Sequence, residues 1–95
     1  MPRAAAEAVP GASRTYDFSL WIQTPDAKTG RIAAVTYEFN HPTFPQKQQT
    51  STDAGSAFRV GYRGWGCLHS VIITIKTVEG AEERIDFDMC KAIGW

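Results

Sequence analysis

The sequence predicts an all-β domain built as an antiparallel β-sandwich, and three features of the chain support this. Hydrophobic and polar residues alternate in several short segments, with the period of two that is typical of strands. Turn-forming Gly, Pro, Asn and Asp residues separate these segments. No segment has the apolar spacing of an amphipathic helix. We therefore expect two sheets that pack face to face around one core.

The chain has 95 residues, which is the length of one domain. Residues 1–14 are rich in alanine, contain two prolines and show no periodicity, so we expect a flexible lead-in or linker there. This segment also lacks the apolar stretch of a signal peptide. The folded domain is expected to span residues 15–95.

Two strands are expected in the first half of the domain. Residues 16–24 alternate cleanly, and Pro25 ends this strand because proline cannot donate to a ladder. Residues 31–40 form the second expected strand, which ends at His41 and Pro42. The polar segment that follows is long for a hairpin loop, so it is a candidate functional loop that could also hold a short edge strand.

Three more strands are expected in the second half. Residues 57–61 form a short strand, residues 62–66 a glycine-rich turn, and residues 68–78 the strand with the strongest pattern. Gly80 lies in a hairpin turn that leads to a last strand at residues 83–88. From the inward positions we predict a core of Phe18, Leu20, Val35, Tyr37, Phe58, Val71, Ile73, Ile75, Ile85 and Phe87.

The composition excludes several classes of partner. Ten basic and ten acidic residues balance to zero net charge, without a basic run, which argues against nucleic-acid binding and against direct contact with a membrane. The lack of a signal peptide favours the cytoplasm, or the nucleus if the protein is eukaryotic. The two cysteines, Cys67 and Cys90, do not make a disulfide framework, and in that compartment we expect them to be small buried thiols.

Two motifs lie at strand ends, where the loops of a sandwich gather. His41-Pro42-Thr43-Phe44-Pro45 directly follows a strand, and Gly64-Trp65-Gly66 comes about twenty residues later, before the strongest strand. Together they resemble the YEATS domain family, in which a Leu-His-x-Ser/Thr-Phe motif ends one strand and a Gly-Trp-Gly-like motif opens another. The resemblance covers nearly the whole chain after the lead-in, and a prokaryotic branch of the family fits best.

The resemblance implies an immunoglobulin-like sandwich that binds a ligand without catalysing a reaction. In eukaryotic members the ligand is an acetylated or longer acylated lysine. By this comparison, Phe44 and Trp65 would lie on the two sides of the acyl group. Thr43 would bond the acyl amide with its hydroxyl, and His41 would shape the pocket wall. The implied partner is a peptide or protein with an acylated lysine, and the domain would be tethered within a larger protein.

The chemistry of such a site is reasonable for these residue types. An acyl-lysine amide is flat and uncharged, so two aromatic faces can enclose it. A free lysine would bring an ammonium group whose desolvation is costly. We expect Gly64 and Gly66 to allow unusual backbone angles around Trp65 and a close approach of the ligand.

Other readings of the same residues remain open. Phe44 and Trp65 could cap the core of a scaffolding sandwich that binds a protein partner through its edge strands or loops. Cys67 and His69, two residues apart, could be imagined with His41 as a nucleophile and base, but no orienting acid is recognisable.

A metal site is the remaining alternative. It would need His41, His69, Cys67 and Cys90 to converge without paired spacing. We therefore expect no catalytic residue, no metal and no cofactor.

Overall fold

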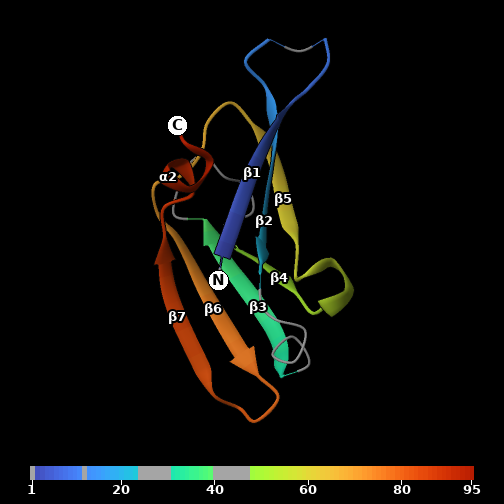
Figure 1. Ribbon diagram of the computed structural model, residues 1–95, viewed down its shortest axis with the longest axis vertical. Coiled ribbons are helices and arrows are strands. Elements are labelled where there is room, and N and C mark those ends of the chain that lie inside the picture. The colour runs from blue at the N-terminus through green and yellow to red at the C-terminus, as the bar shows by residue number, and fades with distance from the viewer. Residues whose placement is uncertain (1, 12, 24–30, 40–47) are drawn as a thin grey trace.

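The computed structural model of the chain describes residues 2–11, 13–23, 31–39 and 48–95. It confirms the predicted all-β sandwich, with two antiparallel sheets (Figure 1). The three-stranded sheet has the order β1 (Pro2–Ala8), β2 (Tyr16–Ile22), β5 (Val60–Gly64). The four-stranded sheet has the order β4 (Gln48–Ser51), β3 (Ile32–Phe39), β6 (Val71–Thr77), β7 (Glu82–Phe87).

The core lies between the two sheets, where the alternating residues of β2, β3 and β6 face one another. Tyr37 is the largest fully buried side chain of the core. Its hydroxyl donates a hydrogen bond of 2.7 Å to the carbonyl oxygen of Phe58. The predicted core residues confirmed as buried are Phe18, Leu20, Val35, Tyr37, Phe58, Val71, Ile73 and Ile75.

The prediction of Ile85 and Phe87 as core residues is only partly right. Both are partly buried, because β7 is the edge strand of its sheet and is covered on one side only. The core also contains residues that the prediction left out: Ile22, Phe39, Leu68, Met89 and Cys90.

The expectation of a flexible lead-in is wrong for Pro2–Ala8, which forms β1. This strand pairs with β2 along its full length, from Pro2 opposite Ile22 to Ala8 opposite Tyr16. Alanine occupies both faces of the segment, so no alternation of apolar and polar residues marks it as a strand. The segment is a strand because its backbone N–H and C=O groups form hydrogen bonds with β2, which the side-chain pattern does not indicate.

The expected strand at residues 57–61 is also wrong in its bounds. Ala57 and Phe58 have φ angles of 59° and 58°, in the left-handed region, so they end the short 3-10 helix Ala54–Ser56 and do not belong to a strand. The Phe58 ring is buried in the core, and this burial outweighs the β propensity of the segment. As a result β5 begins at Val60 and takes in most of the predicted glycine-rich turn.

The chain ends in a short helix, α2 (Met89–Ile93), where only a turn was expected. Asp88 caps it, because its side chain accepts a hydrogen bond from the backbone N–H of Lys91. Within the part of the chain that the structure describes, no helix has the length and apolar character needed to cross a membrane.

Candidate ligand-binding site

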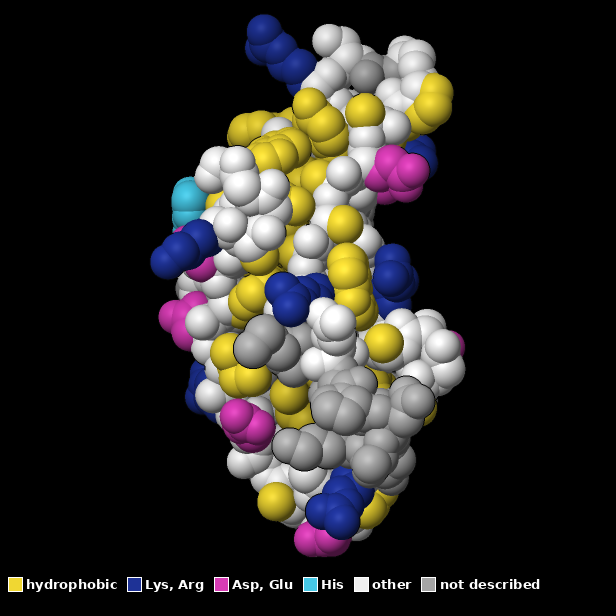
Figure 2. All heavy atoms as spheres, viewed as in Figure 1, with side chains coloured by type: hydrophobic (Ala, Val, Ile, Leu, Met, Phe, Trp, Pro, Cys, Tyr) yellow, Lys and Arg dark blue, Asp and Glu magenta, His cyan; other side chains and the backbone are white. Residues whose placement is uncertain are grey.

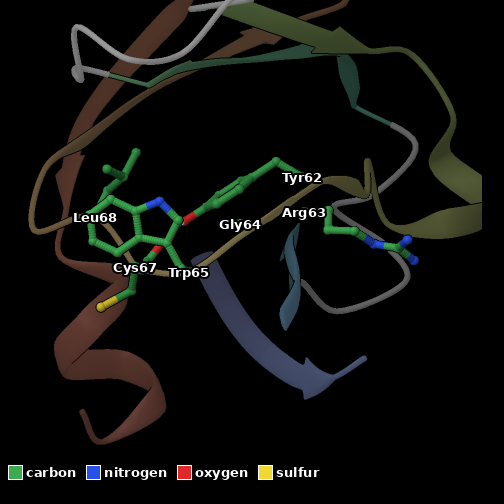
Figure 3. Close-up of a pocket in the computed structure, with 7 residues that line it drawn as sticks. Tyr62, Arg63, Gly64, Trp65, Cys67 and Leu68 are labelled. Atoms are coloured by element: carbon green, nitrogen blue, oxygen red, sulfur yellow. Dashed lines mark hydrogen bonds between the residues drawn. The ribbon is translucent and has the colours of Figure 1, made fainter. Parts of the chain in front are cut away.

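A small pocket lies where β5 ends and the chain turns toward β6 (Figure 3). Its volume is about 110 Å³, and it is lined by residues 62–68. Gly64 is the last residue of β5 and Trp65 the first residue after it. The Gly-Trp-Gly motif therefore follows a strand and does not directly precede one, as the sequence had indicated.

Trp65 is the most exposed large hydrophobic residue of the described chain, with 79% of its surface accessible. This exposure contradicts the reading in which Trp65 caps the core. Exposing an indole ring has no benefit for folding, because the free energy of burial is lost. A role outside the core is therefore the better explanation for the ring.

The glycines beside Trp65 do not adopt unusual backbone angles, so that expectation is wrong. Neither Gly64 nor Gly66 has a φ angle in the left-handed region. A Cβ atom at Gly64 would make ordinary contacts of 3.6 Å with the Tyr62 ring, and one at Gly66 would have nothing within 4 Å. The missing side chain of Gly66 leaves open space beside Trp65. This agrees with the second expectation for these glycines, that they allow a ligand to approach the backbone closely.

Tyr62 connects this loop to the core. Its ring stacks on that of Phe18, with centroids 4.9 Å apart, and meets the ring of Phe39 edge to face at 5.5 Å. Its hydroxyl donates to the carbonyl oxygen of Gly66 at 3.0 Å and also lies 3.4 Å from Sδ of Met89. Burial raises the pKa of Tyr62, so the hydroxyl remains a neutral donor at physiological pH.

Sequence reasoning did not assign Tyr62 to the site. The signal was present, because Val60, Tyr62 and Gly64 alternate along β5 and Tyr62 therefore faces the core beneath the motif. This alternation was not recognised because residues 62–66 were predicted to form a turn.

Cys67 fixes the other end of the loop through a disulfide with Cys90, with the two Cα atoms 5.3 Å apart. The expectation of free thiols is therefore wrong. The register of β6 and β7 explains the pairing: Val71 lies opposite Phe87, and continuing this antiparallel register brings residue 67 beside the start of α2. The backbone N–H of Met89 also donates to the carbonyl oxygen of Leu68 at 3.1 Å.

The pocket has little charge around Trp65. Arg63, the one charged lining residue, points away from the Trp65 ring (Figure 3). Its guanidinium donates two hydrogen bonds to the carboxylate of Asp17, of 2.7 Å and 3.1 Å, and this hydrogen bonding lowers the pKa of Asp17. An uncharged ligand group is the type that this surface can accept without leaving an ion desolvated.

The structure places Gly64, Trp65 and Gly66 together at this pocket. The other predicted site residues, His41, Thr43 and Phe44, lie outside the described residues. The opposite wall proposed for the pocket therefore remains a sequence prediction.

A comparison with protein-family models matches the prokaryotic YEATS domain over residues 16–90. The chain belongs to the prokaryotic YEATS domain family. The match begins with β2 and ends at Cys90, so it includes the pocket and the disulfide. YEATS domains are immunoglobulin-like binding modules and are not known as enzymes. A search of the curated proteins finds no match to the sequence.

Proposed function

We propose that this YEATS domain is a reader or sensor of acylated lysine, or of a related acyl group, and that Trp65 forms one wall of its binding slot. The observation that carries the proposal is a largely exposed indole ring on a loop that is fixed at both ends. A ring that is already positioned loses less conformational entropy when a ligand binds.

The surroundings of Trp65 suit a flat, neutral group. An amide can stack on the indole face, and the open space at Gly66 lets the ligand approach the backbone. Phe44 is proposed as the second aromatic wall, with Thr43 bonding the amide and His41 shaping the rim. The pocket of about 110 Å³ is smaller than the roughly 300 Å³ of the smallest drug-sized sites. We therefore expect weak affinity, on the order of micromolar or poorer.

The proposed partner is a protein or peptide with an acylated lysine. We propose a cytoplasmic domain, tethered within a larger protein, because acylated lysines of other proteins would be accessible to it there. The net charge of zero gives no electrostatic reason for a nucleic-acid partner.

A scaffolding role in protein–protein interaction is the second candidate. It is favoured by the exposure of Trp95, at 54%, in addition to that of Trp65. Figure 2 shows hydrophobic side chains gathered near the C-terminal end of the chain. In that case the domain would bind a partner whether or not its lysines are acylated.

The test is a calorimetric titration with three versions of one peptide: acetyl-lysine, crotonyl-lysine and unmodified lysine. We expect saturable binding of the acylated peptides and at least tenfold weaker binding of the unmodified one. Trp65→Ala should abolish the binding. Val78→Ala is the matched control, because Val78 is also exposed, at 63%, but lies in the β6–β7 turn. Equal binding of all three peptides, or none, contradicts the proposal.

A further inference from the structure

A second group of chemically active side chains lies around the disulfide that ends the Trp65 loop. Donor atoms of His69, Asp88 and Cys90 all lie within 4.8 Å of one another. Cys67 is not a member of this group, but its sulfur is bonded to that of Cys90. Three candidate metal ligands therefore lie together, and a fourth is attached to one of them.

The spacing of these residues is paired, although the sequence analysis did not recognise it. Cys67 and His69 form a Cys-x-His pair before β6, and Asp88 and Cys90 form an Asp-x-Cys pair after β7. The β6–β7 hairpin places one pair opposite the other, because Val71 pairs with Phe87 at its open end. Structural zinc sites also take their ligands as two closely spaced pairs from separate parts of the chain.

The donor set suits zinc. Zinc takes four ligands in a tetrahedron from Cys sulfur, His nitrogen and carboxylate oxygen, at about 2.0–2.3 Å. The ligand atoms are then roughly 3.3–3.8 Å apart by tetrahedral geometry. The three donors that lie within 4.8 Å of one another need only a small contraction, and the two sulfurs have to move apart once the disulfide is reduced.

Asp88 is well prepared to act as a ligand. One of its carboxylate oxygens accepts the hydrogen bond from the Lys91 backbone, at 3.1 Å, and lies 3.4 Å from Nδ1 of His69. A carboxylate has about four acceptor sites, so Asp88 can accept the Lys91 hydrogen bond and also bind a cation.

The cysteines decide when the site can form, because thiolates bind zinc and a disulfide does not. We propose that the reduced domain binds one zinc ion through Cys67, His69, Asp88 and Cys90. A thiol reductant first exchanges with the disulfide: two reductant thiols become one disulfide, and Cys67 and Cys90 each gain a proton and become thiols. Zinc then displaces those two protons and binds the two thiolates.

The zinc ion would replace the disulfide as the link between the Trp65 loop and α2. In an oxidising compartment the covalent bond holds Cys67 to Cys90, and in a reducing cytoplasm the metal would do so. The geometry of the Trp65 loop would therefore be kept in both conditions. The proposal does not depend on the identity of the acyl ligand.

The test uses the whole chain, reduced and then freed of reductant without oxygen. Cobalt serves as a spectroscopic probe, and zinc affinity is measured by competition with a chromophoric chelator. We expect one ion per chain and a thiolate-to-cobalt charge-transfer band with tetrahedral visible bands. The oxidised protein and the Cys67→Ser/Cys90→Ser double variant should show neither.

Two single variants test the other ligands. His69→Ala and Asp88→Asn should each weaken zinc binding by about tenfold or more. Asparagine still caps α2, so the second change removes the ligand and not the helix cap. Glu82→Gln is the matched control, because Glu82 is an exposed carboxylate at the other end of β7 and should leave the affinity unchanged.

Two results of the binding measurements would overturn the proposal. One is the absence of stoichiometric zinc binding by the reduced protein. The other is wild-type affinity in both single variants, which would mean that the thiols alone bind the ion. A thermal melt gives an independent readout: zinc should raise the Tm of the reduced domain, and failure to do so also counts against the site.

Discussion

The hydroxyl of Tyr62 donates a hydrogen bond of 3.0 Å to the carbonyl oxygen of Gly66, across the segment of chain that carries Trp65. The ring of Tyr62 is packed on Phe18 in the core. An exposed tryptophan is thereby joined to the rigid part of the sandwich through one partly buried side chain. This connection explains how the loop can present a ring to solvent and still hold it in place.

Tyr62→Phe is predicted to weaken ligand binding while costing little stability. The ring packing is kept, so the loss of the hydrogen bond to Gly66 should lower the free energy of unfolding by about 1 kcal/mol. Tyr37→Phe is the matched control, because its hydroxyl bonds the carbonyl of Phe58 and not the loop. Chemical denaturation and peptide titration of both variants make the comparison. If both lose affinity equally, the Tyr62 bond has no special role.

Gly66→Ala is predicted to fold normally and to bind ligand several-fold more weakly. Its φ angle is outside the left-handed region and a Cβ atom there meets nothing within 4 Å, so stability should change by less than about 0.5 kcal/mol. The added methyl group would occupy the space that we assign to the ligand. Gly61→Ala provides the contrast, since its Cβ would lie 2.7 Å from the carbonyl oxygen of Phe18 and should destabilise the sheet. Unchanged affinity in Gly66→Ala would place the ligand elsewhere.

Removal of the disulfide is predicted to destabilise the domain when no metal is present. Cys67 and Cys90 are 23 residues apart, and a loop of that size corresponds to about 2–4 kcal/mol. The Cys67→Ser/Cys90→Ser variant should show this loss in chemical denaturation with a chelator added. An equal free energy of unfolding for the variant and the oxidised wild type would show that the disulfide does not stabilise the fold.

The domain is predicted to lose stability at alkaline pH. Burial raises the pKa of Tyr37 and of Tyr62, so the folded state keeps their protons at pH values where the unfolded state loses them. The contribution is fully present below about pH 10, the pKa of an unfolded tyrosine, and decreases as the pH rises above it. Denaturation at neutral pH and at about pH 11 measures the effect. The decrease should be smaller in Tyr37→Phe, and an identical decrease in that variant would contradict this assignment.

The sequence predicts the parts of the fold in which apolar and polar residues alternate. The segments at β2, β3, β6 and β7 were predicted with small errors in their bounds, because one face of each is apolar. β1 was missed because alanine occurs on both of its faces, which weakens the alternation of apolar and polar residues. The left-handed backbone at Phe58 follows from burial of its ring, which depends on contacts with distant residues.

The site was predictable only in part. The motif located Trp65, but its exposure could not be inferred, since aromatic residues usually pack in a core. The Cys67–Cys90 bond could have been found by extending the predicted hairpin register beyond Val71 and Phe87. Composition and compartment arguments pointed instead to free thiols, because they do not consider which residues the hairpin brings together.

The most direct test of the account is the NMR signal of the tryptophan indole N–H groups during titration with an acetyl-lysine peptide. The chain has three tryptophans. Trp21 lies under the guanidinium of Arg59, 4.4 Å from its ring, and Trp95 packs edge to face on Tyr16 at 4.8 Å. We predict that only the signal assigned to Trp65, by its absence in Trp65→Phe, shifts to saturation, and that the unmodified peptide moves none of them. A shift of Trp21 or Trp95 without Trp65, or no shift at all, would contradict the central claim.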